Sequence, residues 1–228
     1  ISIDLSAEEY AVITDYFRLE GKKALITGAG KGIGARIATA FAEMGADVAL
    51  IARTESDRES VASEVRDLGR EALTFACDVT DESALAQVVE GLTNHWGSLD
   101  ILVNNASAIS LTDTPSTPMK RYDLMNHVNT RGTYACTKFC LPHLEKASNP
   151  HVLTLSPPLN MDPKWFRGNL AYTIAKYGMS RCVRGHAAEV EQRGLAAAAR
   201  AAAVCVAPVA CQHRQRGVAD RERVAEVK

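Results

Sequence analysis

Two residues in one short segment of the sequence carry side chains that together can transfer a proton. Tyr172 and Lys176 lie four residues apart in AYTIAK, a spacing that places both on one face of a helix. An ammonium group beside a phenol favours the phenolate and lowers a pKa that is ordinarily about 10. The pair therefore predicts a general acid–base that protonates a carbonyl oxygen near neutral pH. The alternative is an ordinary pair on an exposed helix.

A second segment has the composition of a phosphate-binding turn. The apolar run KALIT leads directly into GAGKGIG, with Gly28, Gly30, Gly32 and Gly34, and then into a helical pattern. Glycines let the backbone turn tightly and approach a pyrophosphate, which amide N–H groups at the start of the next helix would bind. Because a strand precedes the glycines and a helix follows them, the segment predicts a dinucleotide site. A plain turn would not need four alternate glycines.

The residues after the second apolar run indicate which dinucleotide is bound. An acidic side chain there would accept a hydrogen bond from a ribose 2′-hydroxyl, whereas an arginine accommodates a 2′-phosphate. The sequence offers Ala52 and Arg53, and Lys31 adds a positive charge from the glycine segment. NADP(H) is therefore the preferred cofactor, with NAD(H) as the alternative. Arg53 could also be a solvated surface charge.

The elements that must position these residues alternate along the chain. Short apolar runs alternate with helix-length amphipathic segments, which indicates βαβ units. We expect strands near 23–27, 47–52, 72–76, 100–103 and 151–155, and helices near 32–44, 55–69, 81–96, 121–144 and 170–190. The predicted fold class is α/β, a doubly wound parallel sheet of the Rossmann type in three α/β/α layers. Its ligand crevice would lie beyond the carboxyl ends of the strands.

The two ends of the chain differ in pattern from this middle region. Residues 1–20 are expected to form an amino-terminal helical arm, residues 21–208 a single cofactor-binding domain, and residues 209–228 an atypical charged tail. Within the domain, the alanine-rich stretch GLAAAARAAAVCVAP fits either a helix or a sixth strand. The sequence leaves that choice open.

Composition excludes several classes of protein. The 26 basic and 27 acidic residues give a formal net charge of -1, so the basic stripe that binds nucleic acid is missing. The sequence has neither a long apolar run nor a signal-peptide pattern, so we expect a cytoplasmic protein with no membrane partner. Six scattered cysteines show no metal-ligand spacing, and no metal site is predicted.

Five motifs in order resemble one family. TGAGKGIG (27–34), CDV (77–79), NNAS (104–107), NTRG (129–132) and YTIAK (172–176) are together similar to the classical short-chain dehydrogenases/reductases. Residues 108–180 are most similar to the hydroxysteroid dehydrogenase-like protein 2 branch of that family. The resemblance covers residues 21 to about 190.

The resemblance implies an NADP(H)-dependent oxidoreductase that transfers hydride between nicotinamide and a secondary alcohol or ketone. Tyr172 would be the acid–base and Lys176 would bind the nicotinamide ribose, while Asn129, at a kink in its helix, would hold a water beside Lys176. Asp78 and Val79 would flank the adenine, with Asp78 reaching its amino group. The implied cofactor-binding residues are Thr27, Gly28, Gly30, Lys31, Gly32, Ile33, Gly34, Arg53, Asp78, Val79, Asn104 and Ala106, of which Asn104 and Ala106 would line the far wall. Helices 121–144 and 170–190 would form a homodimer or homotetramer interface.

The segment before the tyrosine departs from the family pattern. The family serine that polarises the substrate carbonyl, about thirteen residues before the tyrosine, corresponds here to Leu159. Ser156, followed by Pro157, lies earlier in the chain. We expect Ser156 to keep the role through a shifted loop, with Asn160 as a substitute donor.

The same loop and the carboxyl end bear on the substrate. Trp165 and Phe166 would form an apolar wall for a steroid-like or fatty carbonyl compound, or would simply pack. In this sequence, Pro208 and a charged tail stand where the family has a Pro-Gly turn and the helices that cover the substrate. These departures support the alternative of a dinucleotide-binding sensor or scaffold with weak or no catalysis. The long helices 121–144 and 170–190 support another alternative, a subunit needed mainly for assembly.

Overall fold

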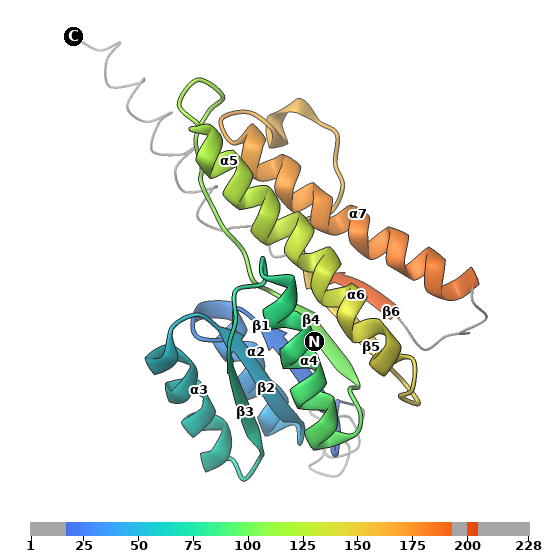
Figure 1. Cartoon of the computed structure of the whole chain (residues 1–228). Coiled ribbons are helices and arrows are strands. Elements are labelled where there is room, and N and C mark those ends of the chain that lie inside the picture. Colours follow the sequence, from blue (N-terminus) through green and yellow to red (C-terminus); the bar gives the residue numbers. More distant parts are fainter. Residues whose placement is uncertain (1–16, 193–199, 205–228) are drawn as a thin grey trace, which may run out of the picture.

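The chain folds around one parallel sheet. A computed structural model describes residues 17–192 and 200–204, and no helix in these ranges is long and apolar enough to cross a membrane. The sheet order is β3-β2-β1-β4-β5-β6, and each neighbouring pair runs parallel (Figure 1). The strands are β1 (Lys23–Thr27), β2 (Asp47–Ala52), β3 (Ala72–Ala76), β4 (Ile101–Asn104), β5 (His151–Leu155) and β6 (Arg200–Val204). The doubly wound Rossmann-type fold is therefore confirmed.

Helices connect successive strands. They are α2 (Gly32–Glu43), α3 (Glu55–Asp67), α4 (Glu82–Trp96), α5 (Met119–Met125), the π-helix η1 (Asn126–Arg131), α6 (Gly132–Leu144), the 3₁₀ turn η2 (Pro163–Trp165) and α7 (Leu170–Gln192). Local sequence sets several of their ends. For example, the Asp81 carboxylate accepts a hydrogen bond from Ala84 N at 3.0 Å at the start of α4, and Gly97 ends that helix with φ 73°.

The predicted bounds of strands β1 to β5 and of the long helices lie within a few residues of the observed ones, because the strands are continuous apolar runs and the helices are amphipathic segments of helical length. The alanine-rich stretch that fitted either a helix or a strand contains β6, which pairs with β5, so the strand interpretation is correct there. Of the proposed amino-terminal arm only residues 17–20 are described, and the charged tail lies outside the described residues.

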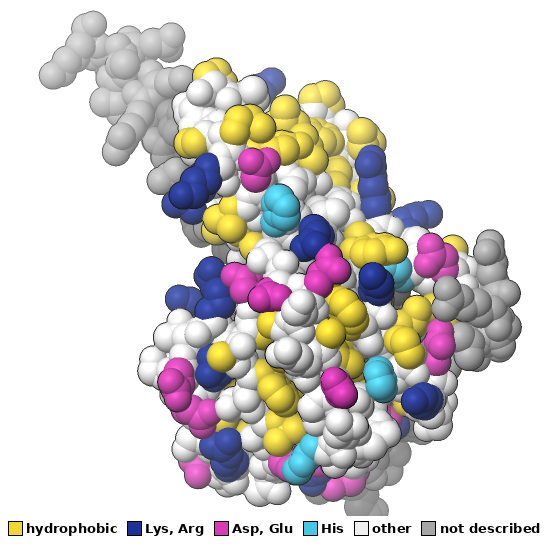
Figure 2. Space-filling view, viewed as in Figure 1, with side chains coloured by type: hydrophobic (Ala, Val, Ile, Leu, Met, Phe, Trp, Pro, Cys, Tyr) yellow, Lys and Arg dark blue, Asp and Glu magenta, His cyan; other side chains and the backbone are white. Residues whose placement is uncertain are grey.

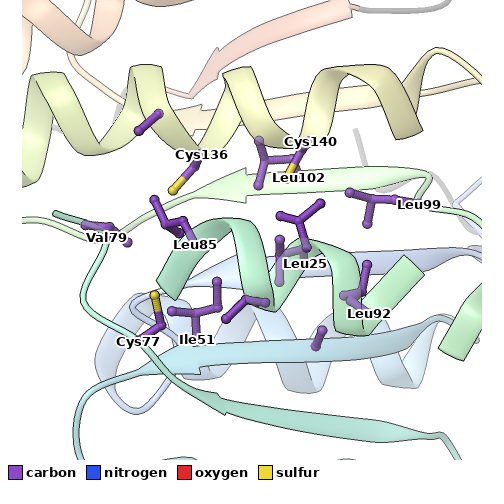
Figure 3. Packing of buried hydrophobic residues seen from close by; sticks show 14 of the residues in the cluster. Leu25, Ile51, Cys77, Val79, Leu85, Leu92, Leu99, Leu102, Cys136 and Cys140 are labelled. Atoms are coloured by element: carbon purple, nitrogen blue, oxygen red, sulfur yellow. The ribbon is translucent and has the colours of Figure 1, made fainter. Parts of the chain in front are cut away.

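Alternate residues of each strand point to opposite faces of the sheet, where separate helices cover them. Leu25 and Ile51 pack with residues of α4 and α6, whereas Ile26 and Leu50 pack with residues of α2 and α3. Figure 3 shows the first of these clusters, in which Leu85 and Leu92 of α4 approach the strands. Three layers result, and the strand ends are left free to build a site.

Three thiols lie inside the same cluster (Figure 3). Cys77, Cys136 and Cys140 are free and buried. Burial raises the pKa of Cys77 to about 11 and that of Cys136 to about 12. These thiols stay protonated near neutral pH and act as small apolar core residues.

The amino ends of the strands are joined by ion pairs. Asp47, at the start of β2, is 8 % exposed. Its carboxylate accepts from Lys23 Nζ at 2.5 Å and from the Glu71 backbone N–H at 2.9 Å, and lies 3.1 Å from an Arg70 guanidinium nitrogen. Burial alone would raise the pKa of this carboxyl, but the hydrogen bonds and the two cations together hold it below its ordinary value of 3.8.

Replacing Asp47 with asparagine is expected to lower the free energy of unfolding by about 2 kcal/mol at pH 7, since charged hydrogen bonds of this kind contribute roughly 1.5–3 kcal/mol. Because the folded carboxyl has the lower pKa, its stabilisation is present above pH 3.8 and is lost as the pH falls through the folded pKa. Urea unfolding at pH 7 and pH 3 measures the difference. Asp67→Asn, at an exposed position, is the control; equal losses in the two variants would contradict the prediction.

Candidate active site

A cleft opens at the carboxyl ends of β1, β2 and β4, where a doubly wound sheet is expected to bind its ligand. Its volume is about 510 Å³. The residues that line it and were predicted as cofactor-binding are Gly28, Gly30, Lys31, Ile33, Arg53, Asp78, Val79 and Ala106. Asn105, Ser107, Asp57 and Arg121 also line it and were not predicted.

The glycine turn forms the floor of this cleft and requires glycine for steric reasons. Gly28 and Gly32 have φ values of 65° and 59°, which disfavour other residues. A Cβ atom on Gly28 would lie 2.9 Å from Ala106 Cα, and one on Gly30 would lie 3.0 Å from Asp57 Cβ. Nothing lies within 4 Å of the Cβ position at Gly32, so the turn is open just where α2 begins. This shape fits a pyrophosphate at the helix amino terminus.

Thr27 does not line the cleft but fixes its floor. The Thr27 hydroxyl donates to Val103 O at 3.2 Å and accepts from the backbone N–H groups of Asn105 and Ala106, both at 3.0 Å. The Asn105 amide donates in return to Thr27 O at 2.9 Å and Gly28 O at 3.0 Å. The ends of β1 and β4 are therefore joined side by side.

Asn104 points away from the cofactor cleft, contrary to the expectation that it lines the far wall. It is 2 % exposed, and its amide nitrogen lies 3.1 Å from Thr137 Oγ1 and 3.5 Å from Thr154 Oγ1. It joins β4 to α6 and β5, while its neighbour Asn105 lies on the cleft wall. Side chains alternate along an extended chain, so the strand direction at NNAS decides which asparagine reaches the ligand.

Charges of both signs gather at the end of the cleft beside β2. Arg53 is 76 % exposed at its side chain, and its guanidinium lies 3.8 Å from Asp78 Oδ2. The other Asp78 oxygen accepts from Thr80 N at 3.0 Å and Thr80 Oγ1 at 2.8 Å, which fixes the carboxylate. Lys31 brings a second cation, whereas Asp57 brings an anion that the sequence did not reveal as part of the site.

Tyr172 lies near the start of α7 and is half-buried. Its ring packs with Ala108 and Tyr122 against Met125, Ala171 and Ala175. Burial raises its pKa, and a hydrogen bond with the Ser107 side chain acts in the opposite direction. Because Ser107 lines the cleft, the phenol lies next to the space that begins at the glycine turn.

Lys176 is on the same helix but contacts a different group. Its Nζ donates to Leu155 O, at the end of β5, at 2.6 Å. Burial lowers the pKa of Lys176 to about 8. The expectation that this ammonium lowers the pKa of Tyr172 is therefore wrong for the ligand-free chain, because burial dominates at Tyr172 and the amine is directed at a backbone carbonyl.

Asn129 lies in η1, so the predicted kink is present as a π-helical turn. The side chain is fully buried, and its amide makes two hydrogen bonds to one residue: Oδ1 accepts from Ala108 N at 2.7 Å and Nδ2 donates to Ala108 O at 2.9 Å. Asn129 therefore fixes the loop after β4.

Ser156 is enclosed. It is 2 % exposed, its Oγ has no hydrogen-bond partner within the described residues, and it is absent from the described lining of the cleft. The loop after it is fastened along α7 by several hydrogen bonds. Ser180 Oγ donates to Pro157 O at 2.6 Å, Tyr177 Oη to Asn160 O at 2.6 Å, and Thr173 Oγ1 to Trp165 O at 3.0 Å.

The remaining loop residues divide between packing and exposure. The Asn160 side chain accepts from Asp162 N at 2.9 Å, so it serves a local turn. The Phe166 ring packs edge-on against Tyr177 with centroids 5.4 Å apart, whereas Trp165 is 48 % exposed. In residues 17–192 and 200–204 no group of three His, Cys, Asp or Glu side chains could hold a metal ion.

Comparison with known proteins identifies the family. The family model described as short chain dehydrogenase matches residues 22–222. The chain belongs to the short-chain dehydrogenase family. Hydroxysteroid dehydrogenase-like protein 2 of Danio rerio is 49 % identical over 179 residues, 75 % of this chain and 43 % of the relative. The chain therefore spans less than half the length of that relative. The family resemblance inferred from the five motifs is confirmed.

Two solved structures that resemble this chain contain cofactors. A metagenomic short-chain oxidoreductase in complex with NADP has a TM-score of 0.74 and 29 % identity, over 82 % of each chain. A 7α-hydroxysteroid dehydrogenase complexed with NADH and 7-oxo glycochenodeoxycholic acid has a TM-score of 0.73 and 28 % identity, over 84 % of this chain and 72 % of that one. Such neighbours bind NAD or NADP, which supports a nicotinamide dinucleotide as the cofactor class.

Proposed function

We propose that the protein is an NADP(H)-dependent oxidoreductase that transfers hydride between the nicotinamide and a secondary alcohol or ketone. One observation carries the proposal: Ser107 lines the cleft that starts at the glycine turn and also lies beside the Tyr172 phenol. A dinucleotide site and a proton donor are thereby neighbours.

The residues have separate tasks in this proposal. The glycine turn and the start of α2 hold the pyrophosphate, and Asp78 and Val79 hold the adenine. The dinucleotide supplies the hydride. Tyr172 delivers the proton to the carbonyl oxygen and removes it in the reverse reaction. Lys176 holds the ribose, which requires it to exchange its bond to Leu155 O for one to the sugar.

The loop before α7 supports an apolar substrate. Leu159, Met161, Trp165 and Leu170 are between 38 % and 71 % exposed. Figure 2 shows hydrophobic side chains gathered on the part of the surface that lies over α5 and α7. We propose a steroid-like or fatty carbonyl compound, a class to which the names of the relatives also point.

The enclosed Ser156 favours the second candidate, a dinucleotide-binding sensor or scaffold with weak or no catalysis. For Ser156 to polarise a carbonyl, the loop fastened to α7 would have to open. Loss of one such donor costs roughly 10²–10³ in rate, so a slow enzyme fits the geometry better than an inactive one.

Nicotinamide fluorescence titration with NADPH and NADH, followed by turnover measurements on a panel of ketones and secondary alcohols, tests the proposal. Binding with turnover supports the oxidoreductase. Binding without turnover on steroid, fatty and short-chain carbonyls supports the sensor, and absence of binding removes both.

The preference for NADP(H) is expected to depend on Arg53. Arg53→Ala should weaken NADPH binding about tenfold, the loss of roughly one charged hydrogen bond, and should leave NADH binding within about twofold. Asp57→Asn should act in the opposite direction, because it removes an anion that faces the same end of the cleft. Arg36→Ala, an exposed residue of α2, makes the same change in net charge as a control. If Arg53→Ala weakens the binding of NADPH and NADH equally, Arg53 does not determine a preference for NADP(H).

We also propose a cytoplasmic homodimer or homotetramer that uses helices α5, α6 and α7. The ring of exposed Tyr134 on α6 packs at a tilt against the ring of His186 on α7, with 5.2 Å between centroids, which gives these helices a common outer face. Analytical ultracentrifugation measures the oligomeric state. If the protein sediments as a monomer, both the oligomer proposal and the alternative of a subunit needed mainly for assembly are wrong.

A further inference from the structure

We propose that Ser107, rather than a serine of the loop before α7, supplies the hydroxyl that stabilises the Tyr172 phenolate during proton transfer. The inference rests on the oxidoreductase function proposed above. It gives a role to Ser107, which belongs to neither the glycine turn nor the Tyr172–Lys176 pair.

Ser107 is held at the middle of a loop that is fixed on both sides. On its amino side, the N–H groups of Asn105 and Ala106 donate to the Thr27 hydroxyl at 3.0 Å. On its carboxyl side, both backbone groups of Ala108 are bonded to the buried Asn129 amide, at 2.7 and 2.9 Å. Few backbone conformations satisfy both anchors, so the position of the Ser107 hydroxyl is strongly limited before any ligand binds.

The second anchor also fixes this loop relative to Tyr172. Ala108 packs with the Tyr172 ring in one small cluster whose buried members are Met125, Ala171 and Ala175. The Ser107 side chain lies within hydrogen-bonding reach of the Tyr172 phenol and lines the cleft. The two hydroxyl groups therefore share the space where a substrate carbonyl would meet the phenol.

Ser156 is also held in place, but among the described residues it neither lines the cleft nor contacts the phenol. It is 2 % exposed, and its Oγ has no partner within the part of the chain that the structure describes. Ser107, by contrast, is exposed on the cleft wall. Of these two serines, only Ser107 can meet the phenol without opening a loop.

The proposed chemistry requires the Ser107 hydroxyl to be the donor of this hydrogen bond once the phenol has lost its proton. When the carbonyl is reduced, the Tyr172 proton moves to the carbonyl oxygen and the negative charge remains on the phenol oxygen. Ser107 keeps its own proton and donates to that oxygen. A hydrogen bond to an anion is about twice as strong as one to a neutral oxygen, so the interaction grows as the charge develops.

The direct test is the ionisation of Tyr172 in the whole 228-residue chain without ligands. Protein labelled with ¹³C at the tyrosine ring carbon that bears the hydroxyl is followed by NMR from pH 8 to 12, with circular dichroism to confirm the fold and Tyr172→Phe to assign the signal. In Ser107→Ala the phenolate fraction of Tyr172 should be about tenfold lower at each pH on the rise, an upward shift in pKa of about one unit. Ser107→Thr should restore it, and Ser110→Ala, in the same loop, should leave it unchanged.

A Tyr172 titration that is the same in wild type and Ser107→Ala would overturn the proposal. So would the reverse pattern in turnover, with a loss in Ser156→Ala and none in Ser107→Ala. If Ser107 stabilises the phenolate, the pH profile of kcat/KM in Ser107→Ala should also move upward by about one pH unit. A loss of folded protein would lower kcat/KM at every pH without moving the profile. Because the titration needs no cofactor, it remains informative if NADPH fails to bind, and that failure concerns the proposed function alone.

Discussion

Phenylalanine in place of Tyr172 is expected to reduce turnover by roughly 10²–10⁴-fold, the usual contribution of a positioned acid or base. The affinity for NADPH should stay within about twofold. The ring would still pack with Ala108 and Tyr122, so the small cluster beneath it keeps its shape and only the proton is lost.

The measurement pairs nicotinamide fluorescence titration with initial rates on the best carbonyl substrate. Tyr134→Phe removes a phenol that is 53 % exposed on α6 and should behave as wild type. Tyr172→Phe with unchanged turnover would remove the acid–base assignment. Reduced affinity together with reduced turnover would show instead that the ring supports the nucleotide site.

The second large effect is expected at Gly34, where an alanine should weaken NADPH binding by more than about 100-fold and lower the free energy of unfolding by roughly 1–3 kcal/mol, the usual result of overpacking. Its Cβ would overlap the Gly28 carbonyl oxygen and lie 2.5 Å from Asn105 Nδ2. That amide is already bonded to the carbonyls of Thr27 and Gly28, so it cannot move aside without opening the turn.

Gly91→Ala on α4 is the matched control. The nearest atom to its Cβ would be Phe75 Cε1 at 3.8 Å, an ordinary contact, and alanine should stabilise this helix by roughly 0.5–1 kcal/mol. Urea unfolding and NADPH titration of both variants distinguish the cases. If Gly34→Ala binds NADPH as wild type does, the close approach of Gly34 to the Gly28 carbonyl and the Asn105 amide is unimportant for cofactor binding.

The fold was accessible from the sequence because its signals are local. Apolar runs such as KALIT and DVALIA have the length and continuity of strands covered on both faces, and the glycine turn lies where the first strand meets a helix. The stretch that contains β6 remained open, because alanine favours helix intrinsically while pairing with β5 is a tertiary effect.

The site was only partly accessible, because side-chain directions depend on contacts between distant segments. Asn104 was placed on the cofactor wall, but its bonds to Thr137 and Thr154 direct it into the interior. The effect of Lys176 on Tyr172 was inferred from helical spacing alone, whereas the Leu155 carbonyl, far away in sequence, captures the amine. Ser107 ends the NNAS motif, but no role for it was evident from the sequence; its position beside Tyr172 depends on the contacts that fix the loop on both sides.

The π-helical turn at η1 has a consequence for how tolerant this protein is to changes in length. One added residue that continues an α-helix rotates everything after it by about 100°, but a π-helical turn takes up the added residue locally, so the helices on its two sides keep their faces. Here α5, on one side of that turn, contacts α7, while α6, on the other side, contacts β4 and β5. Removing a single residue from Asn126–Arg131 would therefore let the turn close as regular α-helix, with α5 still against α7 and α6 still against the sheet. The loss would be the widened turn that places the Asn129 amide beside Ala108.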